Sequence, residues 1–168
     1  MNDFEIKSAY EKDCIEKGLG HKALKAAFES NSDLELRNVT NSKYPEEDWA
    51  GIDVHATVAN IKTFDAFVFK IDYKFRQKSF NDVLFNLQRK DGKDGWAINE
   101  DKKFDYVCYV NEPLRKVCLL PKQDMLDAKD KLKSWSNRQR EKDGQYNAIL
   151  DYSDCKELLP NFIGPIDF

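Results

Sequence analysis

The sequence predicts an α/β fold in which a mixed central β-sheet is flanked by α-helices. Two observations carry this prediction. Apolar and polar side chains alternate strictly through residues 66–76 and again through residues 52–58, which is the pattern of half-buried strands. Segments with apolar residues at helical spacing lie before these strands. Another such segment follows a later pair of apolar runs. Strands and helices mixed along one chain favour helices packed on the faces of one sheet.

The N-terminal part is expected to form two helices, a short strand and a loop. In order, these are helices over 4–17 and 21–29, a strand over 34–39 and a polar loop over 40–48. The second helix has Leu24, Ala27 and Phe28 on one face, so that face is available to the core. Trp49 follows the loop and is expected to anchor the loop or the core rather than to stack on a nucleobase.

Two alternating strands come next, joined by a turn at 60–64. The first has an apolar face of Ile52, Val54, Ala56 and Val58, and a polar face of Asp53, His55 and Thr57. The second has an apolar face of Phe67, Phe69, Ile71, Tyr73 and Phe75, and a polar face of Lys70, Asp72, Lys74 and Arg76. If both strands turn their apolar faces to a common core, Asp53, Asp72 and Lys74 share the polar face.

The next segment is expected to be a helix that begins at Ser79 and ends near Gln88. Serine is a good helix cap, and the segment has an apolar stripe at helical spacing, made of Phe80, Val83, Leu84 and Leu87. The glycine-rich residues 90–95 end this helix.

The remaining elements are a hairpin, a helix and a tail. Residues 106–110 and 116–120 are two apolar runs around the turn signal Asn111-Glu112-Pro113, which predicts a hairpin. Pro121 is expected to start a helix that runs to about Trp135. The tail after Gly144 is expected to lie on the surface as coil.

Length and composition indicate a single domain. With 168 residues, of which 41% are hydrophobic, the chain is long enough to bury its own core. We expect one domain over 1–168, with its core at about 20–120 and a C-terminal helix and coil tail at 121–168. No apolar run approaches the roughly 18 residues of a membrane span, and the N-terminus lacks a signal-peptide layout. A cytoplasmic protein with no membrane partner is therefore expected.

The charge of the chain is mildly acidic but unevenly distributed. Its net charge of −3 and pI of about 5.5 argue against a protein that coats nucleic acid indiscriminately. Basic residues nevertheless gather in stripes along 70–78, 89–93 and 129–142. Such stripes suit a phosphate backbone, and the plain alternative is a solvated surface. The basic residues predicted to contact DNA are Arg76, Lys78, Lys131, Lys133, Arg138 and Arg140.

Two carboxylates beside a lysine suit metal-dependent hydrolysis of a phosphodiester. Carboxylate oxygens are the hard ligands that Mg²⁺ or Mn²⁺ prefers, and a fixed ammonium offsets charge near the attacking water. Asp53, Asp72 and Lys74 are therefore candidate catalytic residues. The plain alternative is a wet strand face, on which Asp and Lys are common. His55 would be either a partner of a metal ligand or polar surface.

At these residues the chain resembles the PD-(D/E)XK nuclease superfamily, most closely its RecB-like branch. Gly51-Ile52-Asp53 is similar to the family's first metal-binding aspartate, and Ile71-Asp72-Tyr73-Lys74 to its hydrophobic-Asp-Tyr-Lys motif. The helix of the branch that carries a metal-ligating histidine is similar to the segment around His21. Gln88 matches the glutamine of its Gln-x-x-x-Tyr motif, with Gly92 at the tyrosine position. The resemblance covers about residues 20–120 and implies a restriction-endonuclease-like core.

The resemblance also implies a deoxyribonuclease that uses Mg²⁺ or Mn²⁺. The ion would be held by His21, Asp53, Asp72 and the backbone carbonyl of Tyr73. Lys74 would orient the attacking water and offset charge on the phosphate, and Gln88 would contact DNA. The alternatives to His21 as the helix ligand are Glu11, Glu16 and Glu29. Cutting both strands would most simply require a homodimer.

A different class of function remains open from the sequence. The chain would then be a catalytically inactive nuclease-like module that binds DNA or protein, as an accessory factor of a phage or mobile element. Some RecB-like nucleases also hold an iron–sulfur cluster. The four cysteines here, Cys14, Cys108, Cys118 and Cys155, have no Cys-x-x-Cys pair, and two of them fall in expected strands. We therefore expect reduced thiols and no iron–sulfur cluster.

Overall fold

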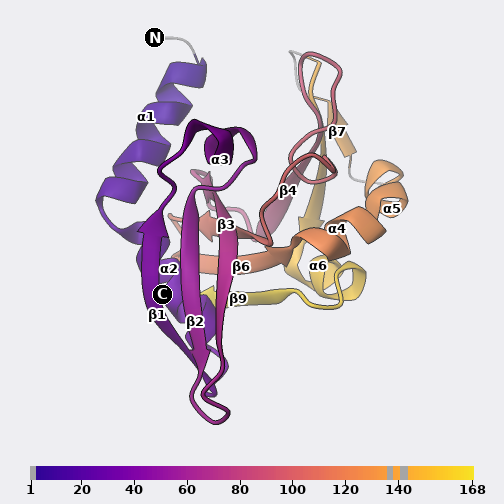
Figure 1. Ribbon diagram of the computed structural model, residues 1–168. Coiled ribbons are helices and arrows are strands. Elements are labelled where there is room, and N and C mark those ends of the chain that lie inside the picture. The colour runs from indigo at the N-terminus through magenta and orange to yellow at the C-terminus, as the bar shows by residue number, and fades with distance from the viewer. Residues whose placement is uncertain (1–2, 136–137, 141–143) are drawn as a thin grey trace.

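The computed structural model describes residues 3–135, 138–140 and 144–168. It has the expected α/β class, with a mixed, curled central sheet flanked by helices (Figure 1). The large sheet contains, in spatial order, β1 (Leu34–Asn41), β2 (Val54–Asn60), β3 (Ala66–Arg76), β5 (Tyr106–Asn111), β6 (Lys116–Pro121) and β9 (Ile163–Asp167). A smaller sheet contains β4 (Asp82–Gln88), β8 (Tyr146–Asp151) and β7 (Arg138–Arg140). The helices are α1 (Asp3–Glu16), α2 (Leu19–Glu29), α3 (Pro45–Trp49), α4 (Lys122–Asp127), α5 (Lys129–Lys133) and α6 (Tyr152–Leu158).

The order of pairing in the large sheet brings β3 to its centre. β1, β2 and β3 form an antiparallel meander, and β3 then pairs with β5 in parallel. β5, β6 and β9 continue with antiparallel pairing. The register places Val54 opposite Ile71, and Asp72 opposite Val107. A parallel pair needs a long crossover connection, and here that connection carries β4 and the loop that follows it.

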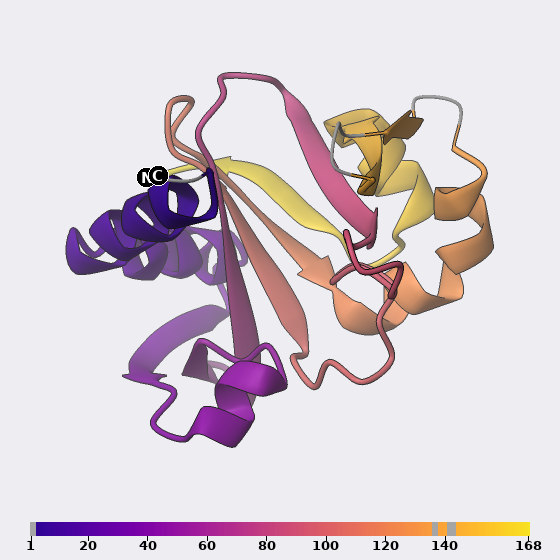
Figure 2. The same cartoon turned by 90° about the horizontal axis from the view of Figure 1, so that it is seen from above.

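Apolar clusters cover both faces of the large sheet. α1 and α2 lie on one face, whereas the smaller sheet and α4 to α6 lie on the other (Figure 2). β5 contributes to both clusters, since Cys108 and Val110 belong to the first and Val107 and Tyr109 to the second. A strand that is buried on both faces reads as a continuous apolar run, which explains the sequences of β5 and β6.

The predicted elements of the first half are largely confirmed, as is the hairpin of β5 and β6. The polar loop predicted over 40–48 contains the end of β1 and most of the short helix α3. The apolar face of β3 is buried only from Ile71 onward, because the far end of the β2–β3 hairpin projects beyond the core and leaves Phe67 half exposed. No helix in the described part of the chain is long and apolar enough to cross a membrane.

The prediction of a helix over 79–88 is wrong, because most of this segment is the strand β4. Its fully buried side chains alternate as in a strand: Val83, Phe85 and Leu87. The Asn111 side-chain amide donates to the carbonyl oxygens of Lys78 and Phe80, which holds the start of the segment away from a helix. β8 supplies the pairing partner. Gln88 therefore ends a strand instead of lying on a helix.

The predictions for the C-terminal part are also wrong in detail. The helix expected from Pro121 to about Trp135 is divided at Ala128 into α4 and α5. The tail expected as coil contains β8, α6 and β9. Asp151 caps α6, since its Oδ1 accepts a hydrogen bond from the Asp154 N–H at 2.8 Å. β8 and β9 pair with β4 and β6, which are distant in sequence, so local patterns do not reveal them.

Candidate active site

The predicted pair of Asp72 and Lys74 lies in the second half of β3. Lys74 Nζ is 2.6 Å from Asp72 Oδ1 and also donates to the Tyr73 carbonyl oxygen at 3.2 Å. Asp72 is only 4% exposed, so it does not lie on the wet strand face that the plain alternative assumed. A buried carboxylate is costly unless it is paired and hydrogen-bonded, which makes this pair unusual for a strand.

Asp53 is brought to the same place by strand pairing that continues beyond the start of β2. Its backbone N–H donates to the Ile71 carbonyl oxygen at 2.8 Å. Its side-chain Oδ2 accepts a hydrogen bond from the Tyr73 N–H at 2.6 Å. The Asp53 carboxyl lies close enough to Asp72 to raise the pKa of the Asp72 carboxyl. The prediction that Asp53, Asp72 and Lys74 lie together is confirmed by this geometry.

The protonation of this cluster is coupled. Burial raises the pKa of the Asp72 carboxyl to about 7, against the opposing attraction of Lys74 and with a further raising contribution from Asp53. Burial alone would lower the pKa of the Lys74 ammonium, but Asp72 and Asp53 outweigh it, and the net pKa is raised. The cluster therefore has more carboxyl groups than its single ammonium can neutralise, and a further cation would favour the ionised form of Asp72.

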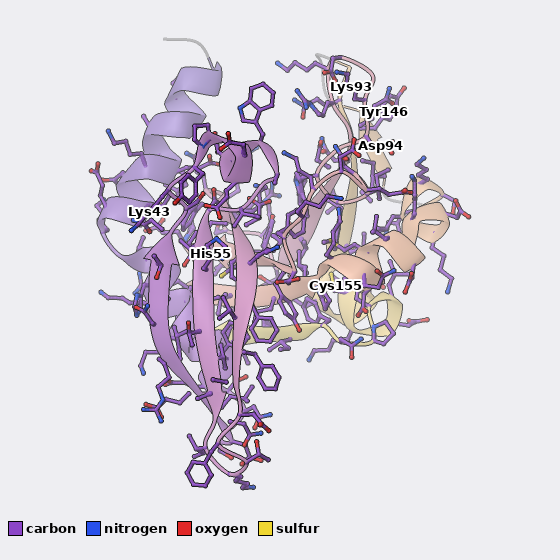
Figure 3. The ribbon with its side chains drawn as sticks, in the orientation of Figure 1. Lys43, His55, Lys93, Asp94, Tyr146 and Cys155 are labelled. Carbon is purple, nitrogen blue, oxygen red and sulfur yellow. The ribbon has the colours of Figure 1, made fainter. Side chains whose placement is uncertain are left out.

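These side chains open into a pocket of about 390 Å³. One wall comes from α1, α3 and β3, and the opposite wall from β4 and the residues up to Lys102. Figure 3 shows His55 on the α3 side, and Lys93, Asp94 and Tyr146 on the β4 side. Five carboxyl side chains line the pocket, namely Glu11, Asp48, Asp53, Asp72 and Asp94. Three basic side chains line it, namely Lys74, Arg89 and Lys102. This excess of carboxylate suits a bound cation.

The end of α3 positions the entrance of the pocket. Gly51 has a φ of 75°, and its N–H donates to the Asp48 carbonyl oxygen, which ends the helix in the left-handed conformation that glycine favours. A Cβ at this position would lie 3.0 Å from Lys102 Cδ, so the glycine also allows close approach of the opposite wall. The turn then leads directly into Asp53.

His55 holds α3 instead of facing the pocket. Its Nε2 is 2.9 Å from Glu47 Oε1. Glu47 also accepts hydrogen bonds from the Ser42 hydroxyl and the Lys43 N–H, and the Ser42 and His55 contacts lower the pKa of Glu47. Of the two interpretations left open for His55, a partner of a metal ligand is not supported, because the histidine contacts a helix carboxylate that does not line the pocket.

His21 is exposed near the start of α2 and does not line the pocket. Its neighbour Gly20 packs against the Tyr73 ring, since a Cβ on Gly20 would lie 2.9 Å from that ring. Of the alternative ligands, Glu16 pairs with Lys12 and Glu29 with Lys25, both on helix surfaces. Only Glu11 of these lines the pocket.

Glu11 also contributes to raising the pKa of Lys74, so it stands close to the cluster. The sequence does contain a signal for Glu11. It lies next to Tyr10 on α1 and one helical turn before the buried Cys14, so it is on the side of the helix that faces the sheet. Within the described residues, no group of three or more His, Cys, Asp or Glu side chains has the arrangement of a preformed metal site. The donors available for an ion are the Asp53–Asp72 pair, the Tyr73 carbonyl and Glu11.

The residues predicted to contact DNA do not form one surface in the structure. Arg76 forms an ion pair with Asp82, with its guanidinium nitrogen 3.1 Å from Asp82 Oδ1, and lies over the Phe80 ring. Gln88 donates to the Gly92 carbonyl oxygen and does not line the pocket. The exposed lysines among them are Lys78, Lys131 and Lys133. The side chains of Arg138 and Arg140 lie outside the described residues. The pocket instead presents Arg89 and Lys102, with Trp96, Asn86 and Asn99 beside them.

The remaining sequence expectations concern the thiols and Trp49. All four cysteines are free and buried. Trp49 is 83% exposed, so the expectation that its side chain anchors the core or a loop is wrong. Its backbone carbonyl does accept a hydrogen bond from Lys102 Nζ, at 2.8 Å. Comparison with known proteins adds no assignment to this geometry, since no protein-family model, curated protein or solved structure matches the chain.

Proposed function

We propose that this protein is a metal-dependent deoxyribonuclease of the PD-(D/E)XK type. The observation that carries the proposal is the ion pair of the buried Asp72 with the half-buried Lys74, which lies beside Asp53 in a carboxylate-rich pocket. Burying the Asp72 carboxyl group beside the half-buried Lys74 ammonium costs stability. A site in which charged groups are buried despite this loss of stability, with a strongly shifted pKa and an open pocket, is a candidate for catalysis.

The order of the strands supports the same proposal. An antiparallel meander of β1, β2 and β3 is followed by β5 in parallel with β3, and the two aspartates lie at the start of β2 and on β3. This order fits a restriction-endonuclease-like core. The crossover between β3 and β5 contains β4 where the sequence led us to expect a helix, which is a departure within that core.

The helix ligand in this proposal is Glu11 and not His21, because only Glu11 lines the pocket. That choice makes the site the acidic-helix form of the superfamily, as in resolvases and restriction enzymes, instead of the RecB-like form. Asp53, Asp72, Glu11 and the Tyr73 carbonyl would hold Mg²⁺ or Mn²⁺. Such an ion, when bound, lowers the pKa of a water ligand and offsets charge on the phosphate.

The chain's own groups have distinct roles in this proposal. The Tyr73 N–H fixes the Asp53 carboxylate, and the strand register fixes Asp72 beside it. Lys74 carries the ammonium that orients the attacking water and balances the charge that develops on the phosphate oxygens. Burial of the cluster strengthens each of these electrostatic interactions relative to the same groups in water.

The test is cleavage of linear, branched and single-stranded DNA with Mg²⁺ or Mn²⁺. We expect Asp53→Asn, Asp72→Asn and Glu11→Gln each to reduce cleavage by at least about 100-fold, because each removes a charge that holds the ion. His21→Ala is the matched control, since the exposed histidine lies outside the pocket, and it should cleave at the wild-type rate. Circular dichroism checks that each variant is folded.

Two results would contradict this proposal. Full cleavage by both aspartate variants would remove Asp53 and Asp72 from the reaction. A wild-type protein that binds DNA but cleaves none of these substrates with either ion would be the binding module of the competing interpretation, in which the Asp72–Lys74 pair serves the fold alone.

A further inference from the structure

Trp49 has an unexpectedly exposed side chain, and it lies in the sequence between two residues that line the pocket. It is 83% exposed, although tryptophan gains more from burial than most side chains do. Within the described part of the chain its ring takes part in no ring–ring stacking. Asp48 and Gly51, which flank it in the sequence, both line the pocket, so the backbone of Trp49 lies beside the entrance.

The backbone that carries Trp49 is held in place from the opposite wall. Lys102 Nζ donates to the Trp49 carbonyl oxygen at 2.8 Å, and the Lys103 N–H donates to the Ala50 carbonyl oxygen at 2.8 Å. Gly51 closes the turn after the helix. An exposed aromatic ring on a fixed backbone loses little conformational freedom when it binds a flat ligand.

The groups around this ring suit a nucleotide. Lys102 and Arg89 line the pocket together with the carboxyl cluster and can meet a phosphate. Trp96 on the opposite wall already stacks against Phe85, with ring centroids 6.0 Å apart, so part of its ring surface is used within the fold. The Trp49 ring, by contrast, is largely exposed to solvent.

We propose that Trp49 stacks on an unpaired base of the DNA strand whose phosphodiester enters the pocket. This inference rests on the proposed function and specifies its substrate as single-stranded DNA or a frayed end. Bases inside a duplex are stacked on one another and offer no free face, whereas every unpaired base offers one to an aromatic side chain. The ring thereby selects the strand conformation, and the cations of the pocket hold its phosphate.

The test is a binding titration by fluorescence anisotropy with the full chain in Ca²⁺. The probes are a labelled thymidine oligonucleotide, an abasic oligonucleotide of the same length and charge, and a blunt duplex. We expect the wild type to prefer the thymidine strand to the abasic strand by at least about fivefold, as base–aromatic stacking predicts. Trp49→Ala should lose that preference and bind both strands alike. Trp49→Phe, which retains an aromatic face, should keep most of it.

Phe64→Ala is the matched control, because Phe64 is 89% exposed but lies in the β2–β3 turn, at the end of the hairpin away from α3 (Figure 1). It should keep the wild-type preference. A Trp49→Ala variant that still prefers the thymidine strand, or a wild type that binds the abasic strand or the blunt duplex equally well, would overturn the inference. The titration measures DNA binding and not DNA hydrolysis. Loss of cleavage in the aspartate variants and loss of base preference at Trp49 are therefore separate outcomes.

Discussion

Asp72 is an acidic side chain in surroundings that favour its neutral form. It is buried beside a second carboxyl group, and Lys74 compensates only part of that cost. The sequence contains the signal for this arrangement, because strict alternation on β2 and β3 places Asp53, Asp72 and Lys74 on one face. The sequence contains no signal that Asp72 is buried. The residues that cover this face come from the crossover between β3 and β5, whose sequence is compatible with a helix as well as with a strand.

The pKa of Asp72 leads to a prediction about stability without metal. The folded protein retains a proton up to about pH 7 that the unfolded chain releases near pH 3.8. The contribution of Asp72 to the free energy of unfolding is therefore fully present below about pH 4. It decreases as the pH rises and is lost once the pH has passed about 7. We expect Asp72→Asn, measured by urea denaturation with a chelator, to gain stability relative to the wild type between pH 4 and 7 by a few kcal/mol.

Lys74→Met provides the matched comparison for that titration. Because Lys74 lowers the pKa of Asp72, its removal should raise that pKa and extend the loss of stability to higher pH. Parallel stability profiles for the wild type and Asp72→Asn across this range would contradict the assignment of a raised pKa to Asp72.

At the scale of the element, the position of α2 on the sheet depends on Gly20. A Cβ at this position would lie 2.9 Å from two carbon atoms of the Tyr73 ring, which is itself buried and stacked on Phe75. The helix can therefore approach β3 closely only because residue 20 lacks a side chain. The sequence predicts a metal ligand at His21, whereas in this fold it is the neighbouring Gly20 that packs against β3.

Gly20→Ala should destabilise the protein although alanine is the better helix former. The gain in helix propensity is about 1 kcal/mol, whereas forcing a methyl group against a fixed ring costs about 1–3 kcal/mol. Urea denaturation should show a net loss of stability. The double variant Gly20→Ala/Tyr73→Leu should lose less than the sum of the two single variants, because a smaller side chain relieves the clash. A more stable Gly20→Ala variant would show that the helix can shift at little cost.

At the scale of the whole molecule, the two apolar clusters are joined by the strands they share. The first cluster contains Leu24 of α2, and the second contains Leu150 of β8. β5 and β6 contribute alternate side chains to both. The sequence predicts that β5 and β6 form a hairpin, because a turn signal lies between two apolar runs. It does not predict the smaller sheet or β9, because their pairing partners lie far along the chain and the local patterns are ambiguous.

The shared strands predict that the molecule unfolds as one cooperative unit. Leu24→Ala leaves a cavity in the first cluster and should cost about 2–5 kcal/mol. Trp96 and Trp135 pack against the second cluster, so their fluorescence reports on the opposite face of the sheet. Since β5 and β6 cannot lose one face and keep the other, the fluorescence transition should shift to lower urea together with the far-ultraviolet circular dichroism transition. Leu150→Ala is the reciprocal variant and should shift both signals in the same way. A fluorescence midpoint that stays at its wild-type value in Leu24→Ala would mean that the half of the molecule around the smaller sheet unfolds independently, and that the pocket lies between two separately stable parts.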